Sequence, residues 1–145
     1  MEILIKTFKE LSLNELYEIL QLRSKVFMLE QDCVYQDIDG KDEKALHILG
    51  KKDEKVIAYT RCFKGGDYFK EASIGRVVVE KSKRKYNYGN EIMLASISAI
   101  ENEFKTKTIK ISAQVYLNKF YTQLGFKNIG KVYLEDGIPH IAMIK

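Results

Sequence analysis

The most informative part of the chain reads Ser73-Ile74-Gly75-Arg76-Val77-Val78-Val79-Glu80-Lys81-Ser82-Lys83-Arg84-Lys85-Tyr86-Asn87-Tyr88-Gly89. Ser73–Glu80 reads as an apolar strand centred on Val77–Val79, which is typical of a central strand buried on both faces. A basic loop, Lys81–Gly89, follows and opens a helix. The first amides of a helix lack intrahelical partners, so this junction suits a phosphate group. A solvated basic turn before an ordinary helix is the alternative.

The rest of the chain alternates between strand and helix patterns. Alternating residues predict a strand at 2–8, and Ser12 or Asn14 is a plausible N-cap for an amphipathic helix that runs to about Gln31. Its apolar face is predicted to contain Leu13, Leu16, Leu20 and Phe27, flanked by Ile19 and Val26. Further strands are predicted at Leu46–Lys51, Lys55–Phe63, Thr108–Val115, Lys127–Leu134 and Ile138–Ile144, with helices after Gly89 and at Asn118–Leu124.

Composition places the chain among compact folded proteins. Its 145 residues are 46% hydrophobic and include 9 Tyr and 7 Phe, which is the material of one domain over residues 1–145. The net charge of +4 comes from scattered lysines, so we expect no nucleic-acid partner. No apolar stretch is long enough to span a membrane, and no signal-peptide pattern is present. Cys33 and Cys62 have no metal-ligand spacing, which favours a reducing, cytoplasmic location and no bound metal.

A second informative segment is Ser112–Phe126, which reads as a strand, a short helix with Phe120-Tyr121, and Gly125-Phe126 before the next strand. Taken alone, Tyr121 is a packed tyrosine. Together with the first segment, however, the chain resembles the GNAT acetyltransferases in order and spacing. Arg84-Lys85-Tyr86-Asn87-Tyr88-Gly89 stands where that family has Arg/Gln-x-x-Gly-x-Gly/Ala, with Asn87 in place of the first glycine. Asparagine tolerates positive φ, so we expect a distorted phosphate loop that is still functional.

The resemblance is closer to the ElaA-type branch and covers nearly the whole chain. It rests on these blocks: 22–31, 37–42, 73–79, 112–114 and 133–141. It implies an α/β (α+β) GNAT fold, with a mixed, mostly antiparallel sheet of six to seven strands flanked by helices, in the order β-α-β-β-β-α-β-α-β-β. It also implies direct transfer of an acetyl group from acetyl-coenzyme A (acetyl-CoA) to a primary amine of a small molecule or a protein.

The resemblance assigns cofactor and catalytic roles by position. The amides of Arg84, Lys85, Tyr86, Asn87, Tyr88, Gly89 and Asn90 would hold the pyrophosphate. The backbone of Val77, Val78 and Val79 would pair with the pantetheine arm, and one amide of that strand would polarise the thioester carbonyl. Asn118 would contact the cofactor near the sulfur. Tyr121 would protonate the departing thiolate, at a cost of about 2 kcal/mol because a phenol and a thiol differ by about 1.5 pKa units.

The acceptor end of the site is less defined. Deprotonating a lysine-like amine at neutral pH costs about 4 kcal/mol, which a general base or a desolvated pocket must supply. The candidate bases are Glu30, His47, Glu135, Asp136 and His140, and a base acting through ordered water stays open. Solvated hairpin acids and structural histidines are the plainer interpretations of the last four. Gln31 belongs with Arg23, Glu30 and His140 as a candidate substrate contact.

Arg23 falls in line with the apolar face of the first long helix, where a charge needs a partner. An ion pair with Asp37 or Asp39 and a clamp for a substrate carboxylate are both open. Cys33 has no histidine near it in sequence, so a free loop cysteine is favoured over a nucleophile. A homodimer through the C-terminal strands follows only by analogy with the fold.

Two alternative functions remain at this point. Besides the acetyltransferase, the alternatives are a non-catalytic acyl-CoA-binding regulatory module, which the altered phosphate loop favours, and an acyltransferase for longer acyl chains. The sequence identifies neither the acceptor amine nor the oligomeric state.

Overall fold

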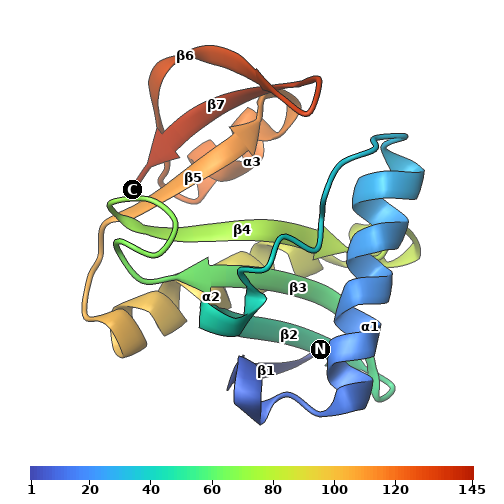
Figure 1. The fold of residues 1–145 in the computed structure, drawn as a ribbon. Coiled ribbons are helices and arrows are strands. Elements are labelled where there is room, and N and C mark those ends of the chain that lie inside the picture. Colours follow the sequence, from blue (N-terminus) through green and yellow to red (C-terminus); the bar gives the residue numbers. More distant parts are fainter.

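A seven-stranded mixed sheet forms the centre of the computed structural model, which describes residues 1–145 (Figure 1). Its spatial order is β1-β2-β3-β4-β5-β7-β6. All neighbours pair antiparallel except β4 and β5, which are parallel. The strands are β1 (Glu2–Thr7), β2 (Leu46–Lys52), β3 (Lys55–Phe63), β4 (Ala72–Val79), β5 (Ile109–Gln114), β6 (Lys127–Glu135) and β7 (Ile138–Ile144). The expected mixed, mostly antiparallel sheet is confirmed.

The helices cover both faces of this sheet. Helix α1 (Leu13–Arg23) continues into a π-helical segment, Ser24–Glu30, and crosses one face of β3 and β4. Helix α2 (Tyr88–Phe104) packs on the opposite face, and α3 (Asn118–Gln123) follows β5. Two apolar clusters result, a larger one under α2 and a smaller one under α1. None of the helices combines the length and apolar character that crossing a membrane would need.

The sheet opens between its two parallel strands. Only Ala72 with Ile109 and Ser73 with Lys110 pair across β4 and β5, and beyond them the strands diverge (Figure 1). Strand β4 is also irregular on its other side, because its register with β3 shifts between Tyr59 and Arg61. Opposite this shift Arg76 has φ +51°. A bulge of this kind bends its strand, so β4 turns away from β5 and leaves part of its backbone without a strand partner.

Three local predictions need correction. The first long helix does reach about Gln31, but its last part is π-helical, a change that the apolar spacing alone does not show. Leu13 is 87% exposed, and the buried face contains the flanking Ile19 and Val26 together with Leu22 and Arg23. The loop after β4 is a 3-10 helix over Lys81–Tyr86, and α2 begins at Tyr88 rather than after Gly89.

Candidate active site

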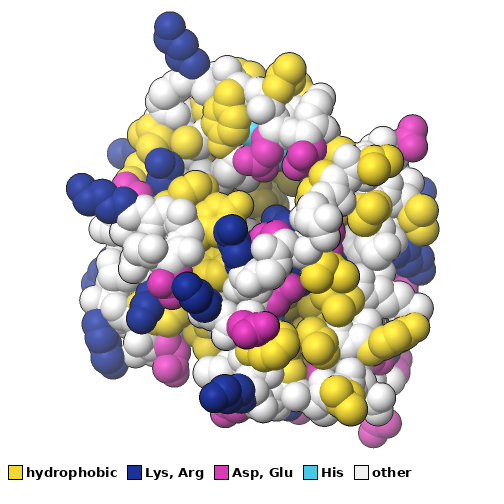
Figure 2. All heavy atoms as spheres, viewed as in Figure 1, with side chains coloured by type: hydrophobic (Ala, Val, Ile, Leu, Met, Phe, Trp, Pro, Cys, Tyr) yellow, Lys and Arg dark blue, Asp and Glu magenta, His cyan; other side chains and the backbone are white.

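A pocket of about 490 Å³ occupies the opening between β4 and β5 on the face that carries α1. Figure 2 shows it as a hollow with acidic side chains at its upper rim, under the β6–β7 end of the molecule. The pocket runs from the start of α2, across β4, to the β6–β7 turn. Its volume lies within the range of small-molecule sites. The residues expected from the sequence can be placed relative to it.

The end of the pocket next to α2 contains the predicted phosphate loop. Asn87 has φ +65° and ψ +20°, so the positive φ expected of it is confirmed. Arg84 and Gly89 line the pocket, and a methyl group added at Gly89 would lie 3.6 Å from Phe120, an ordinary contact. Arg84 donates from Nε to the Val79 carbonyl at 3.1 Å, which holds the loop against the end of β4. The amides that open α2 therefore lie beside the pocket.

The other residues of this loop point elsewhere. Lys85 lies over the ring of Tyr86 at 5.3 Å. Tyr88 is 7% exposed, packs in the larger apolar cluster and accepts a hydrogen bond from Lys52. Neither these side chains nor that of Asn90 lines the pocket. These residues can therefore contact a ligand in the pocket only through their backbone amides.

Val77, Val78 and Val79 line the pocket from β4. Their strand pairs with β3 through Val78 and Val79, whereas it has no ladder partner on the β5 side after Ser73. Backbone N–H and C=O groups on that side are available to an extended ligand. Buried backbone groups need a partner, so this free edge favours a ligand with amide groups of its own.

Tyr121 lies in the pocket lining at the start of α3's last turn. It is 6% exposed and packs edge-on against Phe120 and Phe126. Burial, and to a smaller extent Tyr116, raises the pKa of its phenol above the usual value. The hydroxyl therefore keeps its proton at neutral pH and remains a donor.

Asn118 does not line the pocket with Tyr121. Its amide nitrogen donates to Asn128 Oδ1 at 2.6 Å, toward β6, and the residue is absent from the pocket lining. Its neighbours Tyr116 and Leu117 line the pocket in its place. The structure thus separates two residues that the sequence pattern grouped.

The end of the π-helical segment crosses the pocket mouth. Glu30 pairs with Arg84 at 2.6 Å, and Gln31 exchanges amide hydrogen bonds with Gln114 of β5 at 3.0 and 3.4 Å. Cys33 donates to the backbone carbonyl of Asp136 at 3.3 Å and contacts no histidine. These contacts join the α1 side of the opening to the β5–β7 side and narrow the pocket between them.

His140 and Glu135 lie at the β7 end of the pocket. His140 is 6% exposed, and its Nδ1 is 2.7 Å from the carbonyl oxygen of Ile138. Its Nε2 is 3.3 Å from a carboxylate oxygen of Glu135. The other carboxylate oxygen of Glu135 accepts from Ser112, which also bonds Tyr133. The cross-strand pairs Gln114–His140 and Tyr133–His140 place these side chains on one face of the sheet.

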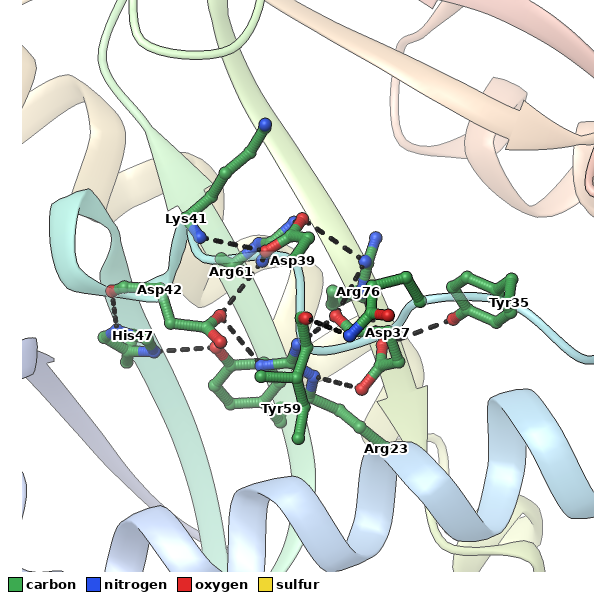
Figure 3. A network of polar contacts seen from close by, with 12 residues as sticks. Arg23, Tyr35, Asp37, Asp39, Lys41, Asp42, His47, Tyr59, Arg61 and Arg76 are labelled. Atoms are coloured by element: carbon green, nitrogen blue, oxygen red, sulfur yellow. Dashed lines mark hydrogen bonds and ion pairs between the residues drawn. The ribbon is translucent and has the colours of Figure 1, made fainter.

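Arg23 belongs to a buried ion-pair cluster, not to the pocket lining. Its Nε and Nη2 bind the carboxylate and carbonyl of Asp37 at 3.0 and 2.8 Å, and its Nη1 binds Asp42 at 2.8 Å (Figure 3). The ion-pair interpretation therefore describes Arg23, although the second partner is Asp42 and not Asp39. Asp39 pairs instead with Arg61 at 2.8 Å and Arg76 at 3.4 Å.

His47 lies in the same cluster. It is fully buried and hydrogen-bonds Tyr59 at 2.6 Å and the Asp42 carbonyl at 2.9 Å. Burial, which opposes the charged form, lowers the pKa of its imidazole. His47 does not line the pocket, whereas Glu30, Glu135, Asp136 and His140 do; of these four, Glu30 is paired with Arg84 of the phosphate loop.

Sequence reasoning missed several residues of the pocket lining. Arg61 and Phe63 are buried two residues apart on β3 and line the pocket, and Arg76 interrupts the apolar run of β4. A charged residue inside an apolar strand was a signal that this position faces a polar site. Tyr68 and Phe69 come from the loop after β3 and gave no signal, because only the tertiary fold brings that loop to the pocket.

The comparisons with known proteins agree with this geometry. The family model described as "Acetyltransferase (GNAT) domain" matches residues 9–145. The chain belongs to the GNAT acetyltransferase family. Among curated relatives of this GNAT protein, Protein ElaA of Escherichia coli is 41% identical over 138 residues, which cover 94% of this chain and 90% of ElaA. The expected resemblance to the ElaA-type branch is confirmed.

Two solved structures superpose on this GNAT protein over 100% of its length and 99% of theirs. The crystal structure of Escherichia coli ElaA has a TM-score of 0.93 at 38% identity. An acyl-CoA N-acyltransferase from Pseudomonas aeruginosa has a TM-score of 0.93 at 35% identity. Family and relatives together support an acyl-CoA N-acyltransferase activity.

Proposed function

We propose that this GNAT protein transfers the acetyl group of acetyl-CoA directly to a primary amine of a small molecule or a protein. The observation that supports the proposal most is the opening between β4 and β5. The unpaired edge of β4, the start of α2 after a left-handed Asn87, and the side chain of Tyr121 all border one pocket there.

The residues present fit a coenzyme A thioester. The amides from Arg84 to Asn90, with the positive charge of Lys83 and Arg84 beside them, suit a pyrophosphate. The free edge of Val77–Val79 suits the amide groups of a pantetheine arm, which would add to β4 as a further strand. When bound, the cofactor supplies an acyl group activated as a thioester. An amide of the bulged β4 is suited to polarise its carbonyl oxygen.

Tyr121 acts in this proposal on the leaving sulfur. Its pKa is raised by burial, so transfer of its proton to a thiolate costs more than the difference of about 1.5 units between an ordinary phenol and thiol implies. Tyr121 therefore first donates a hydrogen bond that stabilises the developing thiolate, and then completes the proton transfer.

Replacing Tyr121 by Phe tests this role. We expect kcat to fall about 100-fold, the lower range of general acid–base contributions, while the Kd of acetyl-CoA stays within about threefold. Thr122→Ser, on the same short helix but outside the pocket lining, is the matched control. Turnover in Tyr121→Phe equal to that of the control over the whole pH range would remove Tyr121 from the mechanism.

Two further expectations remain part of the proposal. Strand β6 is a sheet edge with exposed Ile129, Val132 and Leu134, which suits a homodimer through the C-terminal strands. Both cysteines are free, which suits a reducing, cytoplasmic compartment.

A further inference from the structure

The acceptor end of the pocket contains an unusual arrangement of two hydrogen-bond acceptors. The Ile138 carbonyl can only accept, so His140 Nδ1 carries a hydrogen and donates it at 2.7 Å. A neutral imidazole then has a bare lone pair on Nε2, and this nitrogen lies 3.3 Å from a carboxylate oxygen of Glu135. A proton accepted by Nε2 makes an imidazolium, and a carboxylate at that distance stabilises its charge. His140 is therefore placed to accept one proton beside Glu135.

The charges of the pocket indicate where that proton comes from. The arginines of the lining already have carboxylate partners: Arg84 has Glu30, and Arg61 and Arg76 share Asp37, Asp39 and Asp42 with Arg23. Three arginines and three aspartates balance in that cluster. The acids left over are Glu135 and Asp136, both at the β6–β7 turn. Figure 2 shows acidic side chains gathered at this rim of the hollow. The acceptor end is thus negative and suited to a cation.

Part of the pocket wall is apolar and aromatic. Phe63, Tyr68 and Phe69 line the pocket and contact one another, with ring centroids 5.3 Å and 4.8 Å apart. Phe27 lines it from the α1 side. Arg61 and Lys110 already lie over the Phe63 and Phe69 rings, each at 5.0 Å, so this wall suits the flat apolar body of a ligand. A cationic amine with an apolar body matches both the charge and the walls.

Resting on the proposed function, we propose that the acceptor is an ammonium-bearing molecule without a carboxylate near its nitrogen, and that His140, held by Glu135, takes its proton. The arriving ammonium gives one proton to Nε2, which makes an imidazolium that the Glu135 carboxylate stabilises; the imidazolium releases this proton to solvent after the product leaves. The freed lone pair on nitrogen attacks the acyl carbon, so a C–N bond forms and the C–S bond breaks. Tyr121 protonates the thiolate, and the second proton lost by nitrogen returns to Tyr121 through solvent.

The experiment compares variants with acetyl-CoA and two probes, 2-phenylethylamine and phenylalanine, which differ by one carboxylate. We expect the wild-type protein to favour 2-phenylethylamine at least tenfold in kcat/KM. His140→Ala is expected to lose about 100-fold in kcat, with unchanged acetyl-CoA binding, and to recover at least tenfold with added imidazole. Glu135→Gln is expected to raise KM for 2-phenylethylamine and to narrow the preference between the probes. Glu103→Gln, an exposed acid on α2, is the charge-matched control.

The outcomes separate the two proposals. Wild-type protein that acetylates neither probe nor any amine of a wider panel defeats the proposed function, and this inference falls with it. Active wild-type protein with a folded His140→Ala that keeps activity within threefold, or that imidazole does not rescue, overturns the role of His140 alone. Equal use of phenylalanine overturns the substrate class. If His140→Ala melts early, His140→Gln takes its place in the same assays.

Discussion

Replacing Arg23 by Met perturbs the buried cluster that fixes the wall of the pocket. Arg23 is fully buried and supplies three hydrogen bonds to Asp37 and Asp42, which are 4% and 8% exposed. Without it, two arginines face three aspartates. Removing one partner from a buried ion-pair network costs about 3–5 kcal/mol, because a charge stays buried without compensation. For a chain of this size the melting temperature should fall by roughly 10–20 °C.

The matched control is Lys25→Met, two residues further along the same helical stretch. Lys25 is 62% exposed and 3.7 Å from Glu80, so its loss should change the free energy of unfolding by less than about 1 kcal/mol. Urea unfolding at pH 7 measures both variants. A cost below 1 kcal/mol for Arg23→Met would show that Arg61 and Arg76 alone neutralise the three aspartates, and would refute the reasoning.

The pH dependence gives a second check on the same variant. Burial raises the pKa of Asp42, but the charges and hydrogen bonds of Arg23 and Arg61 outweigh it, so the pKa in the folded protein lies below its usual value. Asp42 therefore stabilises the fold above a pH of about 4, and this contribution is lost as the pH falls. In Arg23→Met, protonation of one aspartate restores the charge balance. The deficit relative to wild type should therefore shrink between pH 7 and pH 4.

Three further predictions concern the phosphate loop, the pocket mouth and acid stability. Asn87→Ala, at φ +65°, should destabilise the fold by about 1–2 kcal/mol in urea unfolding and weaken acetyl-CoA binding, whereas Asn87→Gly should do neither. Glu30→Gln frees Arg84 from its ion pair, so titration at low salt should give a severalfold lower Kd for acetyl-CoA; an unchanged Kd would show that Arg84 is not a cofactor contact. Burial opposes the charge of Glu15 and Asp39, yet bonds from cationic and backbone donors lower both pKa values to about 2. Wild-type stability should thus fall from about pH 4 to pH 2, and Glu15→Gln should flatten that loss.

The sequence was most informative where a single residue type restricts the backbone. Asn87 at a helix start, Gly125 at a helix end and the Asp136-Gly137 turn all have the positive φ that those residues favour. The apolar run of β4 likewise placed the strand correctly. These are local properties, so a local pattern is sufficient to predict them.

Features that depend on distant segments were not predictable. The pairing of Asn118 with Asn128 and the choice of Asp42 over Asp39 as partner of Arg23 depend on how loops cross in space. The buried face of α1 also differs from its apolar pattern, since Leu13 is exposed in the first turn and Arg23 is buried with its aspartate partners. Side-chain partners that lie far apart in sequence decide each of these positions.

Binding of acetyl-CoA to the wild-type protein tests the central claim most directly. Differential scanning fluorimetry gives the shift in melting temperature, and isothermal titration on the same samples gives the Kd. Acetyl-CoA at a hundred times its Kd should stabilise the fold by about 2.7 kcal/mol, with Kd in the micromolar range. No shift and no heat at millimolar acetyl-CoA would contradict the account, because the opening between β4 and β5 would then not be a coenzyme A site.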